Sequence, residues 1–265
     1  MSEFAIAAGA APDRETNFLT DYRTMAGRCI RLSRRQLDAI LMSLTLPIML
    51  MLMFVYLFGG AIDTGGKYVT YVVPGVILLC AGFGSATTAV SVSQDMTGGI
   101  VDRFRSMDVS GAAVLGGHVA ASLARNTVST VMVFGVAFGI GFRPHAGLLD
   151  WLGAAGVVLL FILAISWLAA TIGLLAKSAE AANGFTFFLM FLPYASSAFV
   201  PVDTMPSVIR GFARHQPITP VTESIRGLLL RTPVGSNPGQ AVAWCCGILV
   251  VSMAASRLLF ARRTT

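Results

Sequence analysis

Residues 68–94 read YVTYVVPGVILLCAGFGSATTAVSVSQ and contain no Asp, Glu, Lys or Arg. An α-helix needs about 20 predominantly apolar residues to cross the hydrocarbon core of a bilayer, and this stretch exceeds that length. A transmembrane strand would be about half as long and would alternate apolar with polar side chains. The stretch therefore predicts a membrane-spanning helix.

Other segments of the chain share this scarcity of charge. One of them contains Arg125, whose long side chain is expected to reach the membrane surface. The expected spans are residues 39–62, 68–94, 115–142, 151–176, 181–202 and 240–260. The expected fold class is an all-α membrane protein with six transmembrane helices. Residues 17–265 would form one transmembrane domain behind a flexible tail, residues 1–16.

The composition excludes the other broad classes. The chain has 265 residues, of which 55% are hydrophobic and 12% charged, and its mean hydropathy is +0.74. A soluble domain carries roughly a quarter charged residues, and a disordered chain combines low hydrophobicity with many charges. The cysteines form no Cys-x-x-Cys pair and no zinc-site spacing, so they are interpreted as small apolar fillers: Cys29, Cys80, Cys245 and Cys246.

The distribution of basic residues predicts the orientation. An even number of spans places both termini on one side, and most of the 19 Lys and Arg residues fall on that side. Cytoplasmic loops are enriched in Lys and Arg, so both termini are expected in the cytoplasm. The net charge of +6 then lies at the inner membrane face, where it can meet anionic lipid or a soluble partner. No aromatic and basic cluster suggests a nucleic-acid partner.

The segment before the first span has a helical pattern of its own. Between residues 17 and 38, apolar side chains recur on one helical face and arginines lie largely elsewhere. The apolar face comprises Phe18, Tyr22, Met25, Cys29 and Leu32. This pattern predicts a helix lying in the inner membrane interface. An ordinary solvated flank is the alternative.

The loop between the second and third spans contains a short amphipathic pattern. After Gly98 and Gly99, apolar and charged positions separate onto opposite sides of a helix. Ile100, Phe104 and Met107 form one side, and Asp102, Arg103 and Arg105 occupy the rest. Such a helix suits docking into a groove of a soluble partner. A turn with its apolar edge resting on lipid explains the pattern about equally well.

Residues 201–239 are too long and too periodic for a plain connection. The segment contains six prolines and two helical stretches, at about residues 206–214 and 222–231. Neither stretch is long enough to span a membrane, so both are expected to re-enter the outer leaflet or cap its surface. Irregular backbone at that depth requires protein or water to satisfy its polar groups.

Several chemistries are missing from the sequence. The nearest approach to a P-loop, Gly65-Gly66-Lys67, is followed by Tyr68 rather than Ser or Thr, so no ATP site of that type is expected. The three histidines are scattered, which argues against a metal site. No charged residue is expected in the middle of a span, which argues against a proton relay and favours an apolar pathway. The candidate pathway residues are Phe83, Thr87, Thr88, Phe187, Phe188, Phe191 and Tyr194. Packing or lipid contact is the simpler interpretation of any single phenylalanine.

Four stretches resemble the ABC-2 type export permeases, and specifically the daunorubicin-resistance group. They are residues 47–62, residues 71–75, the loop 95–106, and the outer segment with Phe199-Val200-Pro201, Met205-Pro206 and Gln216-Pro217-Ile218-Thr219-Pro220. The chain departs from the family pattern at Met107-Asp108, at Gly111 and at Gly117-His118.

The resemblance implies that the loop is a coupling helix that binds a separate ATPase subunit. Its coupling residues would be Gly98, Gly99, Ile100, Val101, Asp102, Arg103, Phe104, Arg105 and Met107. It also implies two permease chains, identical or homologous, and two ATPase subunits. ATP and Mg²⁺ would be bound by the ATPase, with no cofactor on this chain.

The expected function is that of the membrane subunit of an ATP-driven exporter. Its substrate would be hydrophobic or amphipathic, drug-like or lipid-like, and would leave the cytoplasm or the inner leaflet. Export of a lipid-linked saccharide is the alternative within transport. A non-transporting scaffold or immunity protein and a membrane-embedded enzyme are the alternatives outside it.

Overall fold

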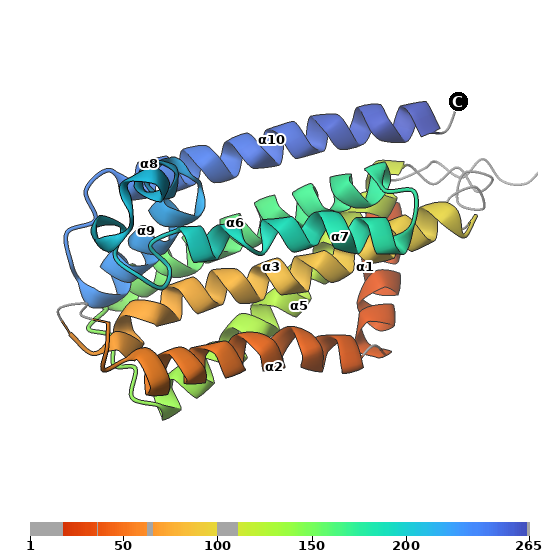
Figure 1. Ribbon diagram of the computed structural model, residues 1–265. Coiled ribbons are helices and arrows are strands. Elements are labelled where there is room, and N and C mark those ends of the chain that lie inside the picture. Colours follow the sequence, from red (N-terminus) through yellow and green to blue (C-terminus); the bar gives the residue numbers. More distant parts are fainter. Residues whose placement is uncertain (1–17, 36, 63–65, 100–110, 264–265) are drawn as a thin grey trace, which may run out of the picture.

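The computed structural model describes residues 18–35, 37–62, 66–99 and 111–263. In these ranges the chain forms a helical bundle without strands (Figure 1). Its elements are α1 (Phe18–Arg35), α2 (Leu37–Met53), the π-helix η1 (Phe54–Phe58), α3 (Tyr68–Thr97), α5 (Gly111–Gly139), α6 (Leu148–Leu175), α7 (Ala179–Leu189), the 3-10 helices η2 (Leu192–Ala195) and η3 (Val202–Thr204), α8 (Ser207–His215), α9 (Ile218–Leu230) and α10 (Asn237–Arg263).

Four of these helices are long and apolar enough to cross a membrane: α3, α5, α6 and α10. Helix α2 continues directly into η1, and this pair occupies the first predicted span. The prediction of one helix over residues 181–202 is wrong, because α7 ends at Leu189 and only a short 3-10 turn follows. Pro193 lies in that turn and has no backbone N–H to continue a helix. At Ser196 the backbone has already adopted an extended conformation.

Helix α3 forms the centre of the bundle. It packs against α2, α5, α6, α7 and α9, and Val72, Val73 and Val76 in its N-terminal half have no exposed surface. Gly75 allows the segment after η2 to touch α3, because a Cβ atom there would lie 2.6 Å from the backbone oxygen of Ala198. Helix α3 therefore contacts two kinds of element: other long apolar helices, and the irregular segment that follows α7.

The two ends of the bundle are closed by different elements (Figure 1). Helix α1 lies across one end, close to the C-terminal end of α10, and α8 and α9 gather at the opposite end. The predicted helix before the first span is thus present over Phe18–Arg35. Met25 and Cys29 of its apolar face are buried, whereas Leu32 is exposed. Its position in the membrane interface remains a prediction.

The two short helices expected in the segment 201–239 are α8 and α9. Helix α9 begins at Ile218, earlier than predicted, because proline is tolerated in a first helical turn and Pro220 lies there. Its side chains Val221, Ile225 and Leu229 are fully buried among α3, α6 and α10. Helix α9 therefore belongs to the core of the bundle rather than to its surface.

Candidate functional site

Helix α3 ends at the two glycines that begin the predicted coupling segment. The backbone N–H of Gly98 donates to the oxygen of Gln94 over 2.8 Å, and Gly99 adopts a φ of +71°, a conformation that favours glycine. The remaining proposed coupling residues lie outside the described ranges: Ile100, Val101, Asp102, Arg103, Phe104, Arg105 and Met107. The coupling helix therefore stays a prediction.

One carboxylate in the last turn of α3 joins three helices. Asp95 Oδ2 accepts a hydrogen bond from Arg28 Nη1 of α1 over 3.1 Å and lies 3.1 Å from His118 Nε2 of α5. The three side chains are 14%, 27% and 9% exposed, respectively. We call this group the Asp95 clamp. It joins the C-terminal end of α3 and the N-terminal half of α5 to α1, three residues before Gly98.

The clamp forms because α1 approaches α5 closely. A Cβ atom on Gly117 would lie 2.9 Å from the backbone carbon of Met25, and one on Gly116 would lie 2.7 Å from the ring of Tyr22. Burial in this contact raises the pKa of the Cys29 thiol to about 11, so the thiol stays protonated at neutral pH. That environment agrees with the interpretation of Cys29 as a small apolar filler.

Arg125 of α5 is bonded to the neighbouring helix α3. It is the fifteenth of the 29 residues of α5, and the expectation that its side chain reaches the membrane surface remains a prediction. Its Nη2 donates to the oxygen of Gly84 and to Thr88 Oγ1 of α3, each over 2.9 Å. A guanidinium at this depth is stabilised by acceptors inside the protein, and α3 provides them.

The candidate pathway residues fall into two separate groups. On α3, Thr88 is buried and accepts from Arg125, Thr87 bonds the oxygen of Gly84 in its own helix, and Phe83 is packed on the core. The aromatic row of α7 and η2 is instead exposed. It consists of Phe187, Phe188, Phe191 and Tyr194.

The aromatic row is ordered by ring contacts. Phe187 and Phe191 meet edge to face with centroids 5.1 Å apart, and Tyr194 stacks on Phe199 at the same distance. Although α3 and α7 are packed together, the structure directs Thr88 toward α5 and the row outward. The seven residues therefore do not form one pocket.

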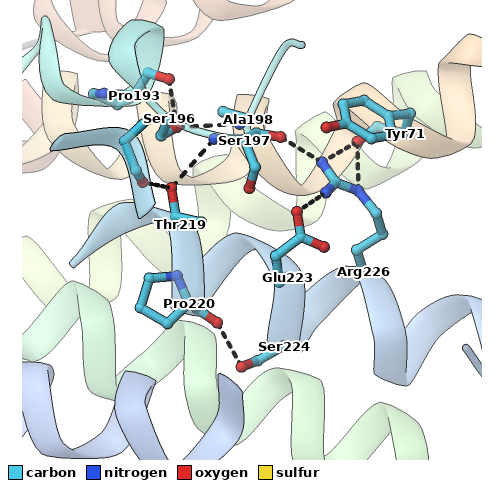
Figure 2. A network of polar contacts seen from close by, with 11 residues as sticks. Tyr71, Pro193, Ser196, Ser197, Ala198, Thr219, Pro220, Glu223, Ser224 and Arg226 are labelled. Atoms are coloured by element: carbon cyan, nitrogen blue, oxygen red, sulfur yellow. Dashed lines mark hydrogen bonds and ion pairs between the residues drawn. The ribbon is translucent and has the colours of Figure 1, made fainter. Parts of the chain in front are cut away.

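A buried arginine organises the opposite end of α3 (Figure 2). Arg226 of α9 donates from Nη2 to the backbone oxygens of Tyr71 and Ser197, over 2.9 and 2.8 Å, and from Nη1 to Glu223. Its guanidinium lies 3.6 Å from the centroid of the Tyr71 ring. We call these four residues the Arg226 network. They join α3, α9 and the irregular segment after η2.

Further hydrogen bonds hold that irregular segment (Figure 2). The backbone N–H of Ser197 donates to Thr219 Oγ1 over 3.3 Å, and the N–H of Ala198 donates to Ser196 Oγ over 3.1 Å. Buried non-helical backbone needs such partners in a membrane. The end of the bundle formed by α8 and α9 is thus a polar, internally bonded cap.

Sequence reasoning missed both polar groups. Glu223, three residues before Arg226, is the sequence signal of an ion pair on one helix face. The sequence pattern places Asp95 in a loop and shows His118 only as one of three scattered histidines. A single arginine in an otherwise uncharged helix such as α5 was the available sign that Arg125 has partners inside the protein.

These features define a class of protein: a helical protein with several apolar helices long enough to cross a membrane and an internally bonded polar cap at one end of the bundle. A model of the ABC-2 type transporter family matches residues 20–230 of the chain. The chain belongs to that family, as its motifs predicted.

The similar proteins are drug-resistance permeases. The chain is 28% identical to the daunorubicin resistance ABC transporter permease protein DrrB1 of Streptomyces coeruleorubidus, over 81% of this chain and 75% of the relative. It is 25% identical to the probable doxorubicin resistance ABC transporter permease protein DrrC of Mycobacterium tuberculosis, over 84% and 82%. The protein is a transmembrane permease subunit of an ABC exporter.

Proposed function

We propose that this permease exports a hydrophobic or amphipathic compound, drug-like or lipid-like, from the cytoplasm or the inner leaflet. The names of the similar permeases support a drug-like substrate. A separate ATPase subunit binds ATP and Mg²⁺ and supplies the energy, and this chain contributes the path across the membrane. Both termini lie in the cytoplasm, in keeping with α1 and the end of α10 at one end of the bundle (Figure 1).

The observation that carries the mechanism is the continuity of α3 between its two polar groups. Tyr71 of the Arg226 network and Asp95 of the clamp lie 24 positions apart in one helix, a rise of about 36 Å. Closure of the ATPase subunits displaces the coupling segment after Gly99. Because Asp95 bonds α1 and α5, those helices move with α3, and the displacement reaches the outer cap at Tyr71.

A second permease copy completes the path. The aromatic row on α7 is exposed, and so are Met49, Met53 and Tyr56 on α2 and η1. Aromatic rings provide a large contact area for apolar molecules. We place the substrate path between two copies, with the aromatic row on its wall and the half-buried Phe83 and Thr87 on the α3 side, whereas Thr88 is buried against Arg125 and lies outside the path.

Replacing Phe104 with alanine tests the proposed coupling. The permease should still enter the membrane, but its transport should fall about tenfold or more, because removing an anchoring aromatic from an interface costs about 2 kcal/mol. Transport and co-purification with the ATPase are both measured. The control is Phe212→Ala, which truncates an exposed phenylalanine on α8. Unchanged transport in the Phe104 variant would contradict the docking role.

A further inference from the structure

A polar cavity of about 240 Å³ lies between α1, α3 and α5, beside the Asp95 clamp. Charged and polar side chains from all three helices line it. They include Arg28, Ser91, Gln94, Asp95, His118 and Arg125. The volume is several times that of a water molecule and is large enough for a phosphate group. The transport steps proposed above use the Asp95 clamp at the edge of this cavity but place no ligand inside it.

The lining carries more positive than negative charge. Among the described residues, it contains two guanidinium groups and one carboxylate, beside the imidazole of His118. Asp95 shares one oxygen between Arg28 and His118, and Arg125 donates to the oxygen of Gly84 and to Thr88 Oγ1 among its partners. Arginine offers a planar set of N–H donors that matches the oxygens of a phosphate. The chemistry of the lining suits an oxyanion.

The depth of the cavity matches a lipid headgroup. Thr88 and Asp95 lie 20 and 27 positions after Tyr68, the outer end of α3, which corresponds to about 30 and 40 Å along the helix. The hydrocarbon core is about 30 Å thick. Where α3 crosses the bilayer along its length, the cavity lies at the headgroup level of the leaflet next to α1. In the orientation proposed above, this is the inner leaflet, where anionic lipids reside.

We propose that this cavity binds the phosphate of a resident anionic phospholipid, which stabilises the junction of α1, α3 and α5. The bound chemistry is a phosphodiester at the end of two acyl chains. A phosphate-bearing substrate would present the same group, so the source of the phosphate needs its own test. The assignment to the inner leaflet rests on the proposed orientation, whereas binding itself is measurable without the ATPase.

Native mass spectrometry of the purified full-length chain, titrated with phosphatidylglycerol or phosphatidylcholine, tests the proposal. We expect the wild type to prefer phosphatidylglycerol at least tenfold. Arg28→Gln and Arg125→Gln should each weaken its binding at least tenfold. The matched control, Arg257→Gln, removes an exposed arginine near the end of α10 and should change binding less than twofold. Equal affinity for both lipids, or an equal loss in the control, would overturn the proposal.

A steric variant keeps the test independent of the arginines. Ser91→Leu places a larger side chain on the cavity wall without changing its charge, so it should also weaken phosphatidylglycerol binding about tenfold. Unchanged binding in a folded Ser91→Leu protein would overturn the assigned location.

The resident role is tested separately from the site. Labelled phosphatidylglycerol in vesicles containing the permease and its ATPase should keep its distribution between leaflets when ATP is added. ATP-dependent movement of the label would overturn the resident role and identify the phospholipid as a substrate. A failure of lipid binding leaves drug transport and ATPase docking unaffected, so the two proposals fail separately.

Discussion

Substitution of Arg226 by leucine is expected to lower the stability of the permease by about 3 kcal/mol, because each buried acceptor left without a donor costs about 1–3 kcal/mol and this guanidinium bonds two backbone oxygens. The Arg226 side chain is 8% exposed, and its loss would leave Glu223 and the backbone oxygens of Tyr71 and Ser197 without this donor. The loss is measured by heating the protein in detergent and determining, at each temperature, how much monodisperse protein remains. Transport should fall as well, since the cap formed by α8 and α9 loses its polar contacts with α3.

Arg214 provides a matched control at the same end of the bundle. It also pairs with a carboxylate, Asp203, but the two side chains are 54% and 81% exposed. An exposed pair contributes about 0–1 kcal/mol, so Arg214→Leu should change the unfolding midpoint little. Arg226→Lys retains the charge but not the fork of donors and should be intermediate. Equal losses in the Arg226→Leu and Arg214→Leu variants would contradict a structural role for the network.

The substitution Asp95→Asn is expected to reduce transport about tenfold while the ATPase still co-purifies. The neutral amide no longer compensates the Arg28 guanidinium, and hydrogen bonds to charged groups contribute about 1.5–3 kcal/mol. Helices α1 and α5 would then follow the movement of α3 less closely. The informative quantity is the number of substrate molecules transported per ATP hydrolysed. A purely structural defect lowers the transport rate and the ATPase rate together and leaves this ratio unchanged.

Two further substitutions serve as the control and the partial rescue for Asp95→Asn. Asp203→Asn removes an exposed carboxylate at the opposite end and should leave the transport ratio unchanged. Asp95→Glu keeps the charge and should recover part of the coupling. If Asp95→Asn transports as many molecules per ATP as the wild type, the clamp does not transmit the movement of α3.

The spanning helices were predictable because the membrane imposes a constraint that can be read directly from the linear sequence. A helix exposed to hydrocarbon needs a long uncharged run, and residues 68–94 and 151–176 correspond to α3 and α6 within a few residues. The same criterion failed at residues 181–202. That run is uncharged throughout, yet Pro193 and the hydrogen bonds of Ser196 and Ser197 stabilise an irregular backbone in it.

The polar groups were not predictable, because they depend on how helices lie against one another. Arg28, Asp95 and His118 are far apart in the chain, and they meet only because Gly116 and Gly117 allow α1 to approach α5. Likewise, Gly84 has room for only a hydrogen, since a Cβ atom there would overlap Asn126 of α5. Small residues at helix contacts determine which polar side chains become neighbours, and hydropathy does not record them.

The most direct test of the central claim is ATP-dependent uptake of a panel of hydrophobic, drug-like compounds and fluorescent lipids into inside-out vesicles that contain this permease and its ATPase subunit. Our account predicts accumulation of at least one of them that requires both subunits and hydrolysable ATP, and that falls at least tenfold when the ATPase is inactivated. An ATPase that co-purifies with the chain, in vesicles whose uptake of every compound is the same with and without the permease, would contradict it. That outcome would favour a membrane scaffold over an export path.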